Sequence, residues 1–479
     1  MEAGRKMMSK RGKACVLSVA VVLLAAFGAA AKDYYIDPER GDDGNSGAAA
    51  AAWKSFANVV SYYKADYRPA GWVELKPGDC IYLKNGVYSE LLHPGEWKKG
   101  RAGGGSFVAY FRGMRGEAGR PFEIKAFPGH KPVIDPQGKG FGLSIFRSGN
   151  WRVEGIEVRR AFGRGISVTE SEKVRIRGVH VHDTDGVDNN NISGLYMTDC
   201  RGVEVSGCTF NDNYDRTCAD TGGRATENST NVVIFGGMRG GDISVHDCLI
   251  YQSLPVSHAL SGGGIKYKHA SRAPGAYFRV YNNVFRNCKF FAFGSGTANT
   301  HFHHNLIAGG AGICSRDFGG VTHQVDQVFE NNTLYGTSGF VFNPTIRWRN
   351  KDFPDDPRNI VFRKNIVHDR APAYSAERGI VCVGTYMPDE LYDIVVGEMI
   401  FGDNCYYNPD GRVQFNIAAG FNYKQGYGKG GTYSFAEWKG QFGYDSTSIE
   451  TDPLFVDPNN GNFHLLGQSK CKGLGRYGP

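Results

Sequence analysis

The sequence lacks the signals of several common protein classes. It contains no Cys-x-x-Cys pair, no phosphate-binding glycine loop and no nucleophile elbow, so cysteine-ligated metal sites and nucleotide binding are not indicated. Long periodic apolar runs of the kind that form helices are few, whereas 66 of the 479 residues are glycine and 25 are tyrosine. This composition predicts many short strands and turns.

The N-terminus has the pattern of a secretory signal peptide. Five basic residues fall within the first 13 positions, an apolar run follows from Cys15 to Phe27, and Ala29-Ala30-Ala31 is a plausible cleavage site. The run is too short for a typical membrane span, and no other candidate span occurs. We expect residues 1–31 to be removed from a secreted or periplasmic protein, with a retained N-terminal anchor as the alternative.

The net charge and the cysteines say little about partners. The signal region carries five basic residues and Glu2, so the formal charge of +7 falls to about +3 in the mature chain. An overall balance this weak does not indicate nucleic acid, and an acidic partner would have to bind a local cluster. Ten cysteines remain after Cys15 is removed. Export permits disulfides, but we expect most cysteines to be buried core residues, with one or two bridges.

An irregular repeat runs through the middle of the chain. A small or amide residue followed by alternating apolar positions recurs at Gly155, Gly178, Cys208, Cys248, Asn283, Asn305, Asn332 and Asn365. A coil this short cannot bury its apolar face alone, so such repeats stack into one continuous core. Asparagines at equivalent positions of stacked coils can hydrogen-bond to one another and to the backbone.

Both ends of the mature chain carry motifs that support this interpretation. Pro77-Gly78-Asp79 is followed by Ile81-Tyr82-Leu83 and Gly86-Val87-Tyr88, and Asp452-Pro453-Leu454-Phe455 is followed by Gly461-Asn462-Phe463-His464-Leu465. These motifs resemble the first and last coils of secreted right-handed parallel β-helix proteins, the pectin-lyase-like group. The resemblance implies an all-β, single-stranded right-handed parallel β-helix with an N-terminal cap. We expect one domain over 32–479, with the cap and first coils in 32–150, central coils in 151–405, and C-terminal coils and tail in 406–479.

A strand entered through glycines, residues 262–269, lies among the longest coils. Ile265 and Tyr267 alternate with Lys266 and Lys268, so both lysines face away from the core, about 7 Å apart. Two like charges at this distance favour an anionic partner or the loss of one proton. A solvated strand face is the alternative.

Polar insertions in the neighbouring coils supply further candidate site residues. The acidic positions are Asp183, Asp185, Asp188, Asp212 and Asp215. Long loops on a rigid scaffold are where binding and catalysis concentrate, and outward positions of successive coils lie about 4.8 Å apart. The aspartates can therefore share a groove with the lysines and bind Ca²⁺ through carboxylate oxygens. Ordinary turn chemistry is the alternative.

This set of residues suits β-elimination from a uronic-acid-containing polysaccharide, in which a cation neutralises the carboxylate and a base removes the C5 proton. The predicted base is Lys268 or Lys266, with a preference for Lys268, and Arg316 would neutralise the carboxylate. Substrate contacts are predicted for His269, Arg224, Tyr196, Phe293, His301 and His303. We expect a monomer whose partner is an acidic polysaccharide.

The central coils also resemble a family. Ile265-Lys266-Tyr267-Lys268, then Asn283-Val284-Phe285-Arg286-Asn287 and His304-Asn305-Leu306-Ile307, is similar to the central coils of chondroitinase B-like and alginate lyases. In those families one strand gives a catalytic lysine and the following coil gives an arginine. The arginine strand is not matched, because residues 290–296 stand in its place without arginine or histidine. Arg316, one coil further on, is the substitute that the sequence offers.

Two other function classes stay open. A glycoside hydrolase would use paired aspartates such as Asp212, Asp215 and Asp220. A non-catalytic polysaccharide-binding protein would stack exposed aromatic rings on sugars and needs no titrating group in its groove. His301 and His303 share a strand face, but no acidic third ligand follows at a recognisable spacing, so they do not predict a metal site.

Overall fold

The computed structural model describes residues 30–92, 106–186, 191–215, 229–235, 241–255, 262–268, 276–295, 298–316, 324–343, 357–368, 379–383, 389–411, 413–417 and 431–478. Ala31–Pro479 forms one compact unit. The expected signal peptide lies almost wholly outside the described residues. No helix in the described part of the chain is long and apolar enough to cross a membrane.

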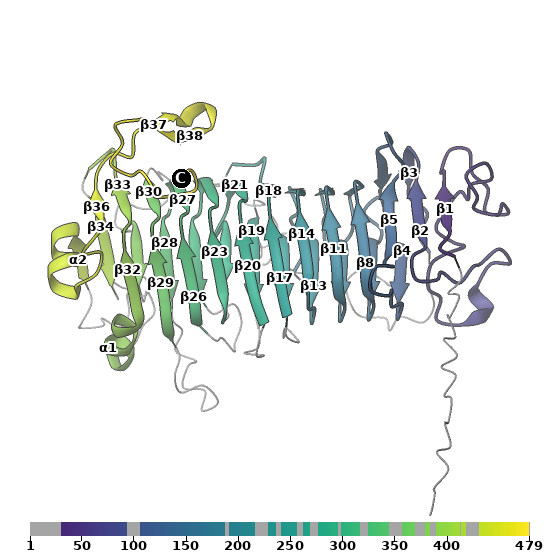
Figure 1. Ribbon diagram of the computed structural model, residues 1–479, viewed down its shortest axis with the longest axis horizontal. Coiled ribbons are helices and arrows are strands. Elements are labelled where there is room, and N and C mark those ends of the chain that lie inside the picture. The colour runs from purple at the N-terminus through teal and green to yellow at the C-terminus, as the bar shows by residue number, and fades with distance from the viewer. Residues whose placement is uncertain are drawn as a thin grey trace, which may run out of the picture. The chain divides into compact units, whose positions relative to one another are not determined.

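The compact unit is a stack of coils, and successive coils add one strand each to three long sheets (Figure 1). The first 12-stranded sheet contains β1 (Asp33–Ile36), β2 (Cys80–Leu83), β5 (Phe122–Ala126), β8 (Gly149–Glu154), β11 (Glu172–Arg177), β14 (Val203–Ser206), β17 (Gly241–His246), β20 (Ala276–Tyr281), β23 (Thr300–His303), β26 (Val325–Glu330), β29 (Arg358–Arg363) and β32 (Met399–Gly402).

The second sheet also has 12 strands and carries the lysine strand, β19. Its members are β4 (Phe107–Arg112), β7 (Phe141–Phe146), β10 (Arg164–Thr169), β13 (Ser193–Thr198), β16 (Thr230–Phe235), β19 (Gly263–Lys268), β22 (Phe293–Ser295), β25 (Ile313–Arg316), β28 (Phe340–Asn343), β31 (Val381–Val383), β34 (Gln414–Ile417) and β35 (Gly431–Ser434). Its pairs are parallel except β34 with β35.

The third 12-stranded sheet contains β3 (Gly86–Tyr88), β6 (Pro132–Ile134), β9 (Glu157–Arg159), β12 (His180–His182), β15 (Thr209–Asn211), β18 (Leu249–Tyr251), β21 (Val284–Cys288), β24 (Leu306–Gly310), β27 (Thr333–Thr337), β30 (Ile366–His368), β33 (Cys405–Tyr407) and β36 (Ile449–Glu450). The remaining elements are the hairpin of β37 (Phe455–Asp457) and β38 (Asn462–Leu465), the helices α1 (Asp389–Glu398) and α2 (Phe435–Phe442), and the 3₁₀ turns Ala65–Tyr67 and Pro458–Asn460.

In-register apolar columns form the core. Ile166, Leu195, Val232 and Ile265 pair in sequence across β10, β13, β16 and β19, and all four are fully buried. Because the side-chain period of a strand is two, the residues between them face outward. The predicted all-β parallel β-helix is therefore confirmed, with one interior shared by all the coils.

The predicted alignment of asparagines is also confirmed. Asn283, Asn305, Asn332 and Asn365 are fully buried at the turns that join the first sheet to the third. Each side-chain amide donates to the Oδ1 of the next asparagine at 3.0–3.2 Å, and Asn404 completes the column. Each backbone N–H donates to the same oxygen, which ties neighbouring turns together.

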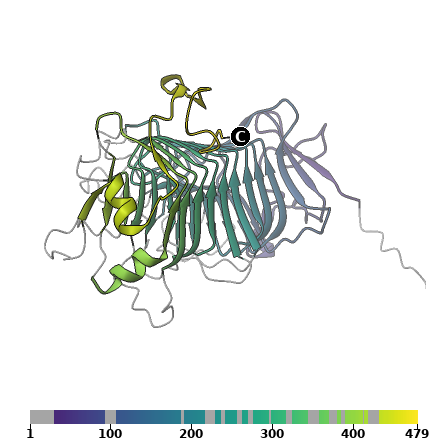
Figure 2. The same ribbon diagram turned by 60° about the vertical axis from the view of Figure 1, so that its left-hand side comes forward.

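The C-terminal tail folds back along the outer face of the third sheet, beside the stack (Figure 2). Phe455 and Phe463 pack on outward apolar residues of β24 and β30, and a disulfide joins Cys405 to Cys471. Near the end of the chain, Arg476 Nη1 donates to the Asn283 carbonyl at 2.6 Å. The tail therefore spans the coils from β33 back to β21. The seven other described cysteines are buried thiols, as expected.

Candidate functional site

The outer face of the second sheet carries the two lysines, on β19. Lys266 pairs in register with Val233 on one side and Gly294 on the other, and the same column continues to Cys314 of β25. Although this column faces away from the core, the Lys266 side chain is only 1% exposed. Lys266 is therefore a covered residue and not part of a solvated strand face.

Lys266 lies in a small apolar and sulfur-containing environment. Its Nζ is 5.6 Å from the centre of the Phe291 ring, which packs with Cys314. Burial raises the pKa of the Cys314 thiol to about 12, and the positive charge of Lys266 acts in the opposite direction. Gly294, between Lys266 and Cys314 in the register, contributes no side chain to the column.

Arg316 lies on the same outer face, at the end of β25, and pairs with Asn343 of β28. Arg316 follows Cys314 by two residues, and Cys314 lies in the column of Lys266, so Arg316 is two strands from β19, roughly 9.6 Å. The side chain of Lys268 lies outside the described residues, as do His269 and Arg224. The structure thus brings the predicted lysine strand and the predicted arginine to one face.

His301 and His303 lie on β23 of the first sheet, and hence on a different face from Lys266. His301 Nε2 is 2.8 Å from Glu330 Oε1, and the His303 ring stacks on Tyr281 at 5.1 Å. Burial lowers the pKa of His303 to about 4, and the neighbouring histidines add to this effect. The coil carries these histidines to another sheet, so they do not lie beside Lys266, and their contact with substrate stays a prediction.

The two predicted aromatic contacts are covered. Phe293 is fully buried in the core, where it stacks on Phe302 at 4.5 Å, so its prediction as a sugar contact is wrong. Tyr196 does lie in the outward column of Lys266, on β13, but it is only 6% exposed. The Arg164 guanidinium is 3.4 Å from the centre of its ring. That ring face is therefore not available to a sugar.

The described aspartates hold turns together. Asp212 accepts hydrogen bonds at 2.7 Å from both the backbone N–H and the hydroxyl of Ser253. Asp183 lies 2.7 Å from His182 Nδ1, Asp185 accepts from the backbone of Gly186, and Asp215 is buried. Among the described residues these carboxylates do not gather into a group of three metal ligands. They do not fit the predicted Ca²⁺ site, because their oxygens serve the local backbone and neighbouring side chains; Asp188 lies outside the described residues.

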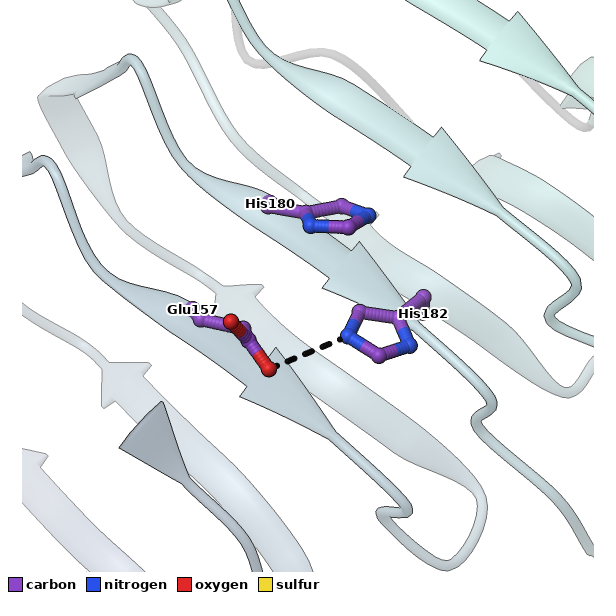
Figure 3. A group of neighbouring side chains, drawn as sticks. All are labelled: Glu157, His180 and His182. Carbon is purple, nitrogen blue, oxygen red and sulfur yellow. Dashed lines mark hydrogen bonds and ion pairs between the residues drawn. The ribbon is translucent and has the colours of Figure 1, made fainter. Parts of the chain in front are cut away.

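A group of metal-ligating type does occur on the outer face of the third sheet, at Glu157, His180 and His182 (Figure 3). His182 Nε2 is 3.2 Å from Glu157 Oε1, and the two imidazole rings stack at 4.3 Å. The hydrogen bond to Asp183 raises the pKa of His182; burial opposes this shift, and the carboxylate of Glu157 adds to it. None of the motifs in the sequence predicted this group.

The repeat alignment contained a signal for these residues. Glu157 follows Gly155 by two positions, and His180 follows Gly178 by two, so both occupy the same place in consecutive copies. The structure pairs them directly, as well as Arg159 with His182. Aligning the outward positions of the repeat, and not only the apolar ones, would have identified the group.

A groove with a volume of about 380 Å³ lies elsewhere, on the outer face of the first sheet. Charged side chains line it, among them Arg152, Arg175 and Glu204. Arg175 is 3.2 Å from Glu204, and Arg152 is 2.9 Å from Glu123, so opposite charges are paired along it. This groove lacks the excess of positive charge that would attract a polyanion.

The similarity of this chain to known proteins gives information about its fold. Residues 141–236 match a family described as "Right handed beta helix region". No curated protein matches the chain. Similar solved structures include the pectate lyase Pel9A, with 12% identity over 93% of this chain and 91% of that chain and a TM-score of 0.47.

An alginate lyase from Paenibacillus sp. str. FPU-7 is 13% identical over 77% of this chain and 98% of its own, with a TM-score of 0.35. A lacto-N-biosidase from Eubacterium ramulus is 12% identical over 79% of this chain and 64% of its own, with a TM-score of 0.36. At these values the solved structures carry no argument about chemistry. The family match and the coil topology confirm that the chain forms a right-handed parallel β-helix, the fold of the pectin-lyase-like group.

Proposed function

We propose that this secreted protein cleaves a uronic-acid-containing polysaccharide by β-elimination at the outer face of the second sheet. The observation that supports the proposal is that Lys266 and Arg316 lie on β19 and β25 of this sheet, with Lys268 as the last residue of β19. Cationic residues on strands this close together favour an anionic sugar as the ligand. They also supply the two functions that the reaction needs, which are a base and a group that neutralises the carboxylate.

We assign proton abstraction to Lys268. Lys266 is 1% exposed, so its ammonium acts on the site electrostatically from beneath, while Lys268 stands at the end of β19. Arg316 lies two strands from β19, roughly 9.6 Å, a span that two long side chains can bridge around one bound sugar unit. A guanidinium binds a carboxylate through two parallel hydrogen bonds, which suits Arg316 to the uronate group.

In the reaction, the C5–H bond breaks and its proton moves to the Lys268 amine. Negative charge develops on the uronate carboxylate, where Arg316 and Lys266 stabilise it electrostatically. The C4–O bond then breaks, the C4=C5 double bond forms, and the leaving oxygen takes up a proton from water. The described aspartates serve the local fold.

The test uses the ultraviolet absorbance of the unsaturated uronyl product. The purified mature chain is incubated with a panel of uronic-acid polysaccharides, with and without Ca²⁺. We expect absorbance to rise with at least one substrate, and Lys268→Ala and Arg316→Ala to lower the rate by about 10²-fold or more. Lys139→Ala, at an exposed turn before β7, is the matched control and should keep the wild-type rate.

The same assay separates the other function classes. New reducing ends without absorbance would overturn the lyase proposal in favour of a hydrolase. Retention on a polysaccharide column without any cleavage would favour a binding protein. Among the described residues neither class has a comparable observation, because Asp212 is engaged by Ser253, and Tyr196 and Phe293 are covered.

A further inference from the structure

We propose that Glu157, His180 and His182 bind one divalent transition-metal ion of the Zn²⁺ class, on the outer face of the third sheet (Figure 3). One ligand atom from each residue lies within 4.8 Å of the other two. Ligands about 2.1 Å from a tetrahedral ion lie about 3.4 Å apart, so the side chains have to close by up to about 1.4 Å to complete the site. All three residues are half-buried on adjacent strands, β9 and β12.

The hydrogen-bond network fixes the tautomer of His180. Ser253 holds Asp212 through two hydrogen bonds of 2.7 Å, and Asn211 Nδ2 donates to Asp212 at 2.8 Å. The amide oxygen of Asn211 is therefore the atom that faces His180 Nε2, at 2.7 Å. Because an amide oxygen only accepts, Nε2 must carry the proton, which leaves the Nδ1 lone pair to bind a metal.

His182 is fixed in the complementary way. Its Nδ1 is 2.7 Å from Asp183 Oδ2, and a carboxylate accepts, so Nδ1 carries a proton. Its Nε2 then faces Glu157 Oε1 at 3.2 Å. Both atoms carry a lone pair, so the contact is repulsive without a cation between them. This is the carboxylate–histidine–metal arrangement that orients imidazole ligands. The alternative occupant of this gap is a second proton on His182.

The donor set selects the class of metal. Two imidazoles and a carboxylate are ligands for Zn²⁺ and similar transition metals, with a fourth position open to water or to a ligand oxygen. Ca²⁺ prefers six to eight oxygen ligands and is a poor match. The proposed ion is therefore different from the Ca²⁺ that the aspartates had suggested.

The chain contains a matched control for this site. His301 and His303 on β23 also form a His-x-His pair with a neighbouring glutamate, Glu330. There, however, Arg363 Nε donates to Glu330 at 2.7 Å, whereas Arg159 Nη1 is 3.5 Å from Glu157 Oε1, and His303 Nδ1 lies 2.9 Å from His304 Nδ1. Glu330 is thus shared between His301 and Arg363, and His303 Nδ1 faces His304. The same residue types are present without the three-ligand geometry.

The test is a metal titration of the full mature chain after treatment with EDTA. Zn²⁺ is added in a calorimeter, and bound metal is counted after dialysis. We expect one ion per chain, at least 100-fold weaker binding in His182→Ala and Glu157→Gln, and 10- to 100-fold weaker binding in Asn211→Ala, which removes the group that orients His180. The double variant His301→Ala/His303→Ala should bind as the wild type does.

Two results would overturn the proposal: an absence of stoichiometric Zn²⁺ binding to the wild type, or unchanged binding in Glu157→Gln. Glu157→Gln keeps the side-chain volume, so it serves even if His182→Ala fails to fold, and a circular dichroism spectrum in EDTA verifies its fold. Equal binding of Ca²⁺ and Zn²⁺ would also contradict the assigned donor set. The readout is metal binding, so failure of the lyase proposal leaves it unaffected.

Discussion

Replacing Asn332 with alanine probes the asparagine column at its centre. The Asn332 amide donates to the Phe302 carbonyl and to Asn365 Oδ1, both at 3.0 Å. Its Oδ1 accepts from the backbone and side-chain N–H groups of Asn305, at 3.0 and 3.1 Å. Each hydrogen bond contributes about 1 kcal/mol net, and an orphaned buried group costs about 1–3 kcal/mol. We expect Asn332→Ala to lower the free energy of unfolding by about 3–5 kcal/mol.

The measurement is urea denaturation followed by circular dichroism and by tryptophan fluorescence. Coincident transitions are required, since stacked coils need not unfold in one step. Asn460→Ala is the matched control: Asn460 is exposed and donates only to Asp457 in a turn, so the change should be within about 0.5 kcal/mol. A loss below about 1 kcal/mol in Asn332→Ala would show that the column aligns the turns without stabilising them.

Two further perturbations test the tail and the first sheet. Cys471→Ser removes a bridge that closes a 66-residue separation, worth up to about 4 kcal/mol in the chain-entropy model, and should expose the tail to trypsin at Lys470 and Lys472. A reducing agent should reproduce this loss in the wild type, and equal midpoints with and without reductant would contradict it. The pKa of His303 is lowered from 6.5 to about 4, so the folded chain releases this proton more readily than the unfolded chain. Its contribution to stability is complete above pH 6.5 and is lost as the pH falls from 6.5 to about 4, about 1–2 kcal/mol after allowance for partial exposure. His303→Gln should reduce the dependence of the free energy of unfolding on pH in that range. An unchanged slope would show that other groups cause the pH dependence.

The sequence predicted the fold because the interior of a solenoid repeats. Asn283, Asn305, Asn332 and Asn365 recur as identical residues, and the apolar positions that follow them keep the same alternation. Each copy makes the same contacts with the copy before it, so local pattern and global topology agree. The lysine strand was predicted for the same reason. Ile265 and Tyr267 occupy positions that face the core, and Lys266, between them, occupies a position that faces outward.

The site was harder to predict, because burial on the outer face depends on contacts that no local pattern encodes. In the run from Phe290 to Phe293 three of four residues are phenylalanine, so alternation does not reveal which ring faces the core. The face of Tyr196 is covered by Arg164, which comes from the neighbouring strand β10. The order of residues along the chain also does not show which of the three sheets a strand joins. In the structure, His301 and Lys266 lie on different sheets.

The outer faces of the three sheets differ in the residues that they carry and in what covers them. The tail covers the third sheet from β33 to β21 and leaves Glu157, His180 and His182, on β9 and β12, beyond its end. Lys266 and Arg316 lie on the second sheet, on strands β19 and β25. Since inward residues are constrained by neighbouring coils, chemistry is confined to outward columns, and residues act together only within a column or between adjacent ones. The lysine face and the histidine group share no column or sheet, so removing a metal ion from the histidine group should leave the lysine face intact.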